Sequence, residues 1–414
     1  MEKTDYLIIG ASAAGISAAL AIRNNDLKGS ITVLTDEPFQ PYFRPLIPYI
    51  ITGQKDEQAI GMLGSGPYKD FELEILTNKR VKNLEPLQKI AYIEEGHSVS
   101  YHKVLFATGS RPFIPHEIQG TEAKGVYALR TLGDAKSIAN RLIETKEAVM
   151  IGGGLVNLKA SFALLERGIR VTLVVYSPEV LSQLMEPEDA YLIRKAIETS
   201  GLTILSGQNV RSIVSDKRGV RGVVLDSGKE IPCQMAFIGK GVRPNVEFLS
   251  DSGIKIDKGI VVDEYTQCNI PDAYAAGDVA VTFEPISGQR IVTALWTNAV
   301  EMGRCAGFNM AGLRTKYTGT FGIMNATQIA NTPFVSMGTV HTKGTDYEVH
   351  KEYYKDGYCK LVFSNHGRHL IGVVLIGDIS IAGLCRYLIR NKMDVSAIKR
   401  HIINRTLSYG HLMQ

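Results

Sequence analysis

The sequence predicts an α/β protein with two parallel-sheet domains of one type and a third, α+β domain after them. Two observations support this. A strand, a glycine-rich turn and a helix open the chain at Asp5, and the same order of elements returns at Ala148. The last hundred residues, from Phe321, have strand-like runs followed by a helix from Ile381 and contain no such turn.

The opening stretch has the features of a phosphate-binding turn. An apolar strand ends at Gly10, where glycine lets the backbone turn sharply, and the small residues Ser12 and Ala13 leave room for a pyrophosphate. Gly15 then allows the helix to pack on the strand, and the helix N-terminus offers free N–H groups to an anion. A small-residue turn also occurs in α/β domains that bind no nucleotide, so this motif alone leaves both interpretations open.

Polar and aromatic residues follow the next strands of this domain. Asp36 and Glu37 end the predicted strand 31–35, where a carboxylate accepts the hydroxyls of an adenosine ribose or simply caps a loop. The segment 41–49 is rich in proline and aromatic residues, so it is not a regular helix and is suited to wall a flat ligand. A later strand ends at Ala107-Thr108-Gly109. This ending either lets the backbone approach a cofactor closely or marks a crossover to another domain.

The second repeat has a glycine turn at Gly152 to Gly154, a helix through Leu165 and a strand that ends at Val175. This duplication indicates two Rossmann-like folds. Either each fold binds a nucleotide, or one fold binds a nucleotide and the other is a relic of a former nucleotide site. Later, Asp278 stands at a strand-to-helix junction, and a helix opens at Trp296. Further elements are expected at 134–145 (helix), 189–200 (helix) and 203–240 (a small antiparallel sheet).

Composition excludes several classes of function. The 414 residues carry 46 basic and 42 acidic side chains, a net charge of +4 that is too small and too evenly spread for nucleic-acid binding. The cysteines form no C-x-x-C pair and no metal-ligand spacing, so we expect free thiols and neither a metal nor an iron–sulfur site. No signal peptide and no membrane span is recognised, and the expected location is the cytoplasm. The cysteines are residues 233, 268, 305, 359 and 385.

Four motifs in order, at 10–15, 107–109, 152–157 and 275–278, resemble those of the FAD-dependent pyridine-nucleotide oxidoreductases related to glutathione reductase. Within that superfamily the chain is most similar to the branch of NADH:rubredoxin and ferredoxin reductases, NADH oxidases and nitrite-reductase flavin domains. The stretches at 42–45, 241–245 and 294–298 carry this closer similarity.

The resemblance implies that FAD occupies the first domain. A helix N-terminus directed at the pyrimidine end of the flavin would stabilise the reduced ring. Trp296 is alternatively a core or interface aromatic residue. The implied FAD-binding residues are Gly10, Ser12, Ala13, Ala14, Gly15, Asp36, Glu37, Arg44, Pro45, Val81, Ala107, Thr108, Gly109, Gly277, Asp278, Trp296 and Thr297.

The second domain would present NAD(H), with NADP(H) as the alternative, but it departs from the family pattern. Asn157 replaces the third glycine, Lys159 stands where relatives usually have a glutamate near the nicotinamide, and Val175 stands where NAD-specific members have an acid. Lys159 either forms a salt bridge with a nearby carboxylate or meets an acidic group near the flavin face, or it is a solvated helix lysine. The implied nucleotide-binding residues are Gly152, Gly154, Leu155, Val156, Asn157, Tyr176 and Gly241.

The expected domains are FAD-binding (1–112 and 245–318), NAD(P)-binding (113–244) and C-terminal α+β (319–414). The segment 44–48 lacks the redox cysteine of the disulfide reductases, so the flavin itself must pass electrons to an external acceptor. No catalytic residue beyond the flavin is required, apart from a role for Lys159.

The predicted partner is a ferredoxin, a rubredoxin or an iron–sulfur subunit of a complex, and the chain would act alone, as a homo-oligomer or as part of a hetero-oligomer. A peroxide-forming NADH oxidase and an electron-relay subunit with an impaired nicotinamide site are the alternatives.

Overall fold

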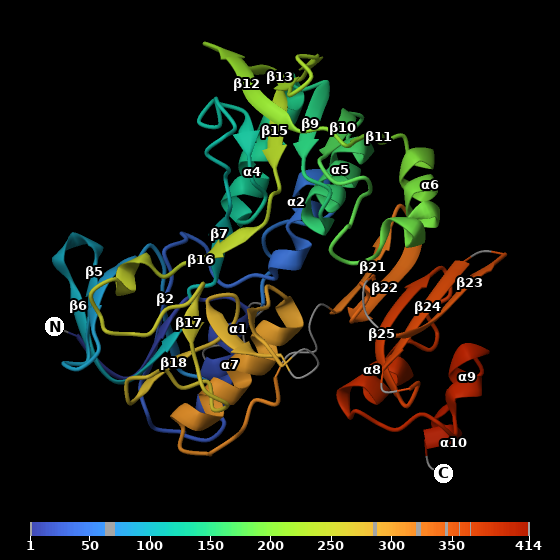
Figure 1. Cartoon of the computed structure of the whole chain (residues 1–414). Helices are drawn as coiled ribbons and strands as arrows, with labels where there is room; N and C mark the ends of the chain where they lie inside the picture. The colour runs from blue at the N-terminus through green and yellow to red at the C-terminus, as the bar shows by residue number, and fades with distance from the viewer. Residues whose placement is uncertain are drawn as a thin grey trace. The chain divides into compact units, whose positions relative to one another are not determined.

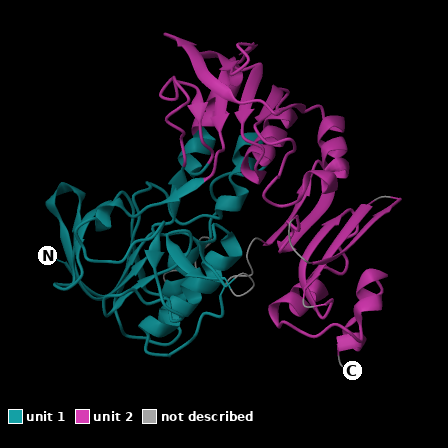
Figure 2. Cartoon of the chain, viewed as in Figure 1, with its two compact units in different colours: residues 1–112, 130–136, 242–320 teal, residues 113–129, 137–241, 321–414 magenta. Residues whose placement is uncertain are grey.

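The structure is a computed structural model that describes residues 2–62, 71–284, 288–319, 324–343, 347–355, 357–364 and 366–412. The chain forms two compact units, each made of several segments of sequence (Figure 2). Unit 1 comprises residues 1–112, 130–136 and 242–320, and unit 2 comprises 113–129, 137–241 and 321–414.

Unit 1 is built on a seven-stranded sheet. Its first five strands run parallel to their neighbours, and the last two form an antiparallel extension. The strands are β3 (Leu73–Leu76), β2 (Ile31–Leu34), β1 (Glu2–Ile9), β6 (Ser98–Phe106), β18 (Ala273–Ala275), β5 (Ile90–Ile93) and β4 (Val81–Glu85). Among the parallel strands β2 and β18 are buried throughout, and β1 and β6 are buried over their last three residues, where their sequences are apolar.

Two helices of unit 1 pack along each other: α1 (Ala13–Arg23), which follows β1, and α7 (Trp296–Met310) (Figure 1). The alanine-rich sequence of α1 permits this close packing, because alanine is both small and a strong helix former. The remaining elements of unit 1 are η1 (Arg44–Leu46), α2 (Pro48–Thr52), η2 (Glu94–Gly96), β7 (Ser110–Pro112), β16 (Val242–Pro244), η5 (Glu247–Leu249), β17 (Ile260–Val261), β19 (Ala280–Phe283) and β20 (Arg290–Val292).

Unit 2 contains a second parallel sheet of five strands and a small antiparallel sheet. The helix α5 (Leu155–Glu166) follows β9, as α1 follows β1. The helix α4 (Leu132–Arg141) begins in unit 1 and ends in unit 2. The parallel strands are β11 (Thr203–Ser206), β10 (Arg170–Val175), β9 (Glu147–Ile151), β15 (Met235–Ile238) and β8 (Val126–Tyr127), and the antiparallel strands are β12 (Val210–Asp216), β13 (Gly219–Leu225) and β14 (Glu230–Pro232).

The C-terminal part of unit 2 is a five-stranded antiparallel sheet followed by helices. Its interior strand β24 is buried along almost its whole length. In sheet order the strands are β21 (Met324–Ile329), β22 (Thr332–Gly338), β25 (His369–Ile376), β24 (Gly357–Ser364) and β23 (Glu348–Tyr354). The helical segments of unit 2 not yet named are η3 (Leu142–Glu144), η4 (Pro187–Asp189), α6 (Tyr191–Thr199), α8 (Ala382–Arg390), α9 (Lys399–Ile403) and α10 (Tyr409–Leu412).

The predicted α/β class with two Rossmann-type sheets is confirmed. The prediction of one antiparallel sheet over 203–240 is wrong at both ends, because β11 and β15 join the parallel sheet. Both strands are only four residues long, and so short a strand fits either kind of sheet, so the local pattern could not separate them. The start of the C-terminal region at Phe321 lies outside the described residues, and the three predicted domain boundaries stay predictions.

Candidate functional site

The first glycine turn lies at the carboxyl ends of β1 and β6. Gly10 has φ +116°, and a Cβ built there would lie 2.1 Å from the carbonyl oxygen of Ala107, so no other residue fits without moving a strand. Ser12 occupies the N-cap position of α1 without a side-chain capping bond, and Ala13 begins the helix. The turn therefore leaves the N–H groups of the first turn of α1 facing the sheet edge, as a pyrophosphate site requires.

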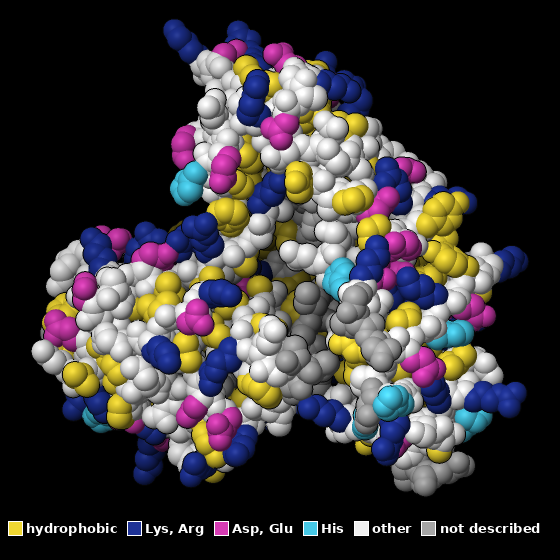
Figure 3. Space-filling model, in the orientation of Figure 1, with side chains coloured by type: hydrophobic (Ala, Val, Ile, Leu, Met, Phe, Trp, Pro, Cys, Tyr) yellow, Lys and Arg dark blue, Asp and Glu magenta, His cyan; other side chains and the backbone are white. Residues whose placement is uncertain are grey.

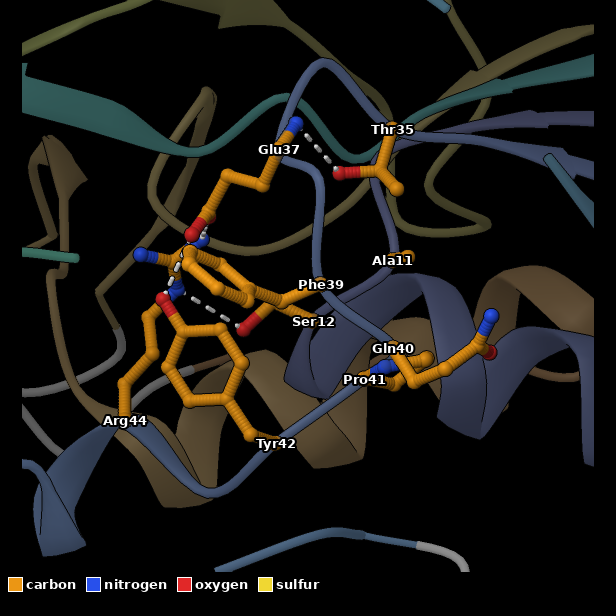
Figure 4. A pocket seen from close by; sticks show the side chains of 9 residues that line it. All are labelled: Ala11, Ser12, Thr35, Glu37, Phe39, Gln40, Pro41, Tyr42 and Arg44. Atoms are coloured by element: carbon orange, nitrogen blue, oxygen red, sulfur yellow. Dashed lines mark hydrogen bonds and ion pairs between the residues drawn. The ribbon is translucent and has the colours of Figure 1, made fainter. Parts of the chain in front are cut away.

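Beside this turn is a pocket of about 220 Å³, counting its open mouth. Figure 4 shows the side chains of Glu37, Tyr42 and Arg44 pointing toward one another. Arg44 pairs with Glu37 and donates through Nε to Ser12 Oγ at 3.2 Å, while Tyr42 donates to Glu37 at 2.7 Å. The lining residues are Ala11, Ser12, Thr35, Glu37, Phe39, Gln40, Pro41, Tyr42 and Arg44.

The two predicted ribose-binding carboxylates differ sharply in placement. Glu37 is largely buried in the pocket wall, whereas the side chain of Asp36 is 56% exposed and faces Arg80 at 3.6 Å. An acidic residue must reach into the pocket to accept ribose hydroxyls, so the geometry favours Glu37 for that role.

A matched pair of variants tests this choice. We expect Glu37→Gln to weaken FAD binding about tenfold, because a hydrogen bond to a charged group contributes about 1.5–3 kcal/mol. Asp36→Asn should leave the affinity unchanged within about twofold, because exposed charges contribute little. Reconstitution of the apoprotein, followed by flavin fluorescence, measures both. A larger loss in Asp36→Asn than in Glu37→Gln would contradict the assignment.

Asp278 belongs to a largely buried polar cluster that also contains Arg130 and Ser110. Its Oδ2 accepts from Arg130 Nη2 and Ser110 Oγ, both at 2.8 Å, and its side chain is only 12% exposed. Arg44 Nη1 donates to the main-chain oxygen of Arg130 at 3.0 Å, so this cluster adjoins the pocket. Sequence reasoning missed Arg130. The place of Arg130 between β8 and α4 was the signal that the sequence offered. The pairing with Asp278 was hidden, because Asp278 lies far away in the sequence.

The remaining predicted flavin residues occupy several parts of unit 1. Trp296 begins α7 and packs on Phe43, with 5.6 Å between ring centroids. Thr108 exchanges hydrogen bonds with Asn245 at 2.9 Å, so its hydroxyl holds the crossover between chain segments. Val81 is buried in the core on β4 and does not line the pocket. Of the others, Ala14 and Gly15 lie in α1, Pro45 in η1, Gly109 beside β7, Gly277 in the turn before Asp278 and Thr297 in α7.

The second glycine turn, in unit 2, repeats the geometry of the first. Gly152 has φ +108°, and a Cβ there would lie 2.3 Å from the carbonyl oxygen of Gly239. Asn157, in place of the third glycine, is 4% exposed and donates through Nδ2 to the oxygens of Ile151 at 3.0 Å and Gly152 at 2.8 Å. The asparagine thus ties the helix to the turn by hydrogen bonds and does not disrupt it.

The other predicted residues of the second site are more exposed. Val156 is 55% and Tyr176 is 74% exposed, while Leu155 begins α5 beside its N-cap Gly154. Gly241 lies just after β15, with φ +100°. The surface at the start of α5 is therefore accessible from solvent.

Lys159 is held by another element of unit 2, and its role beside the nicotinamide stays a prediction. It is half-buried, and its Nζ donates to the main-chain oxygen of Gln328 in β21 at 2.7 Å. Burial lowers its pKa. Within the described residues it forms no ion pair with a carboxylate. Within unit 2 this hydrogen bond therefore links α5 to the C-terminal sheet.

All five cysteines are free and buried. Burial raises the pKa of each thiol, to about 12 for Cys233, Cys359 and Cys385. Because the thiolate is the reactive form, these cysteines lack the character of redox thiols. Among the described residues, no cluster of metal-ligating side chains is present and no helix is long and apolar enough to cross a membrane.

Residues 4–303 match the family model described as pyridine nucleotide-disulphide oxidoreductase. The chain belongs to this family. It is an FAD-dependent NAD(P)H oxidoreductase, and FAD and NAD(H) are its cofactors. The residues present fit FAD, because the Gly10 turn, the N-terminus of α1 and the Glu37–Arg44 pocket meet at one sheet edge.

Two named relatives and one solved structure are similar to this chain over most of its length. It is 28% identical over 413 residues to the NADH-dependent phenylglyoxylate dehydrogenase subunit epsilon of Aromatoleum evansii, covering 99% of this chain and 97% of the relative. It is 33% identical to the NADH oxidase of Methanocaldococcus jannaschii over 75% of this chain and 71% of the relative. The NAD-dependent persulfide reductase of A. fulgidus has a similar structure, with TM-score 0.87 and 26% identity over 94% of this chain and 77% of that chain.

Proposed function

We propose that this chain accepts hydride from NADH and delivers electrons to a separate iron–sulfur or rubredoxin-type carrier, as the flavin subunit of a larger redox complex. The observation that supports this most is the absence of a cysteine from the segment 44–48, together with the burial of every cysteine in the chain. Without a protein thiol to relay them, electrons have to leave by way of an external acceptor.

The residues of unit 1 would hold and tune the cofactor. When bound, FAD supplies two-electron exchange with nicotinamide and one-electron exchange with a carrier. The N-terminus of α1 and the guanidinium of Arg44 would bind the pyrophosphate, and Glu37 would orient the ribose. Asp278, fixed by Arg130 and Ser110, would hold the ribityl hydroxyls. The first turn of α7 would place the positive end of its dipole beside the flavin.

The complex-subunit assignment is supported by the relative from Aromatoleum evansii. That relative is itself one subunit of an NADH-dependent dehydrogenase, and it matches this chain over nearly the full length of both. Basic and acidic side chains are interspersed on the face seen in Figure 3. Shape and local hydrogen bonding would therefore contribute to carrier recognition on that face along with charge.

A steady-state assay tests the proposal. Under anaerobic conditions, NADH oxidation should require an added ferredoxin or rubredoxin and should saturate with its concentration. In air without a carrier, turnover should be at least about tenfold slower. The opposite ranking, with fast oxygen consumption and no response to carriers, would instead support the alternative of a peroxide-forming NADH oxidase; one relative is named NADH oxidase.

A further inference from the structure

A segment of unit 2 connects the second glycine turn to the C-terminal sheet. We call residues 176–190, between β10 and α6, the strap. Its first half packs on the glycine turn: the main-chain N–H of Leu181 donates to the oxygen of Gly153 at 3.0 Å, and Val180 is fully buried. The Cα of Val180 lies 3.4 Å from where a Cβ on Gly153 would be, so the strap packs directly on the turn.

The second half of the strap is held by buried charges of the C-terminal sheet. Lys360 in β24 has no exposed surface and donates to Glu186 Oε2 at 2.6 Å, Asp189 Oδ2 at 2.9 Å and the oxygen of Val340 at 2.8 Å. An ammonium group has three N–H donors, and all three are used here. Lys351 completes the charge balance, with Nζ 3.3 Å from Glu186 and 3.1 Å from Asp189.

Two further hydrogen bonds hold the same segment. Ser336 in β22 donates to the oxygen of Leu184 at 2.5 Å, and the main-chain N–H of Thr342 donates to Glu186 Oε1 at 2.8 Å. Burial acts to raise the pKa of Glu186, but the hydrogen bonds from Lys360 and Thr342 outweigh it and hold the pKa at about 2. Both ends of the strap are therefore fixed, one on the glycine turn and one on the C-terminal sheet.

We infer that Lys360 is a positioning residue for the nicotinamide nucleotide, acting through the strap on the turn at Gly152 to Gly154. The inference rests on the proposed placement of that nucleotide. Leu181 has φ +54°, an unfavourable backbone conformation for a branched side chain. The backbone at this contact with Gly153 stays in that conformation because the buried ion pairs fix the chain a few residues later. Release of the strap lets it relax away from the turn.

The variant Lys360→Met tests this, because it leaves two buried carboxylates without their main partner. We expect Kd for NADH to rise about tenfold or more. The apparent affinity falls in proportion to the fraction of molecules in which the strap still packs on the turn. FAD content and the limiting rate of flavin reduction at saturating NADH should stay within about twofold of the unaltered chain, because the strap acts on nucleotide binding alone.

Val373→Ala is the matched control. Val373 is fully buried in β25, and because it pairs with Leu361 it lies on the opposite face of the sheet from Lys360. It should lower stability without changing Kd for NADH. Equal rises in Kd in both variants, or none in a folded Lys360→Met protein, would overturn the inference.

A milder variant keeps the test decisive should Lys360→Met not fold. Ser336→Ala removes only the bond to Leu184 and should raise Kd about threefold; an unchanged Kd in this variant would overturn the inference. Gly152→Ala in the same assay checks the nucleotide placement itself. If that variant binds NADH normally, the proposed placement fails, and this result is distinct from a failure of Lys360.

Discussion

A Gly10→Ala variant is expected to be purified with less than about a tenth of the FAD of the unaltered chain. Its Cβ would lie 2.1 Å from the carbonyl oxygen of Ala107, which belongs to the segment after β6 and cannot rotate away. The backbone at φ +116° adds strain that glycine does not have, of order 1 kcal/mol or more. The turn must shift, and the pyrophosphate site shifts with it.

The flavin-to-protein absorbance ratio of the purified protein measures this effect. Gly154→Ala is the matched control, because Gly154 has φ −79° and nothing lies within 4 Å of a Cβ built there. That variant should retain full FAD and full stability. Normal flavin content in Gly10→Ala would show that the pyrophosphate does not bind at the first turn.

An Asp278→Ala variant is expected to lose most of its FAD and about 2–3 kcal/mol of stability. The carboxylate is 12% exposed, and the Arg130 side chain that it pairs with is 26% exposed. Removing one member of a largely buried pair leaves the other charge without compensation, which costs more than the pair contributed. The flavin site then also lacks the group proposed to hold the ribityl chain.

Denaturant unfolding of the apoproteins separates the two effects. Asp36→Ala, which breaks an exposed ion pair with Arg80, should cost at most about 0.5 kcal/mol. Adding Arg130→Met to Asp278→Ala should recover part of the stability, because the unpaired guanidinium is gone, but should not recover FAD binding. Full flavin content in Asp278→Ala would contradict its proposed role.

The features that sequence could predict are local ones. The turns at Gly10 and Gly152 each depend on a strand, a glycine and a helix that are adjacent in the chain, so the pattern of residues determines them. The two Rossmann-type sheets follow from the same repeated pattern. Asn157 stands where relatives have a glycine, and this difference suggested an impaired turn. In the structure its side-chain amide instead holds the helix to the turn by two hydrogen bonds.

The features that sequence could not predict depend on residues far apart in the chain. Arg130 meets Asp278, and Lys159 meets Gln328, only once the sheets are assembled. The choice between Asp36 and Glu37 depends on which of the two side chains faces Arg44, and Glu37 is the one that pairs with it. The buried contacts of Lys360 with the strap gave no motif, because a single lysine in a strand has no local signature.

We propose that the flavin is the sole redox group of this chain and gives its electrons to an external carrier. Anaerobic titration with dithionite, followed by the visible absorbance of the flavin, tests it most directly by counting the electrons taken up per FAD. We expect two electrons per FAD, because no thiol joins the reaction. Uptake of four would reveal a redox-active cysteine pair and would contradict it.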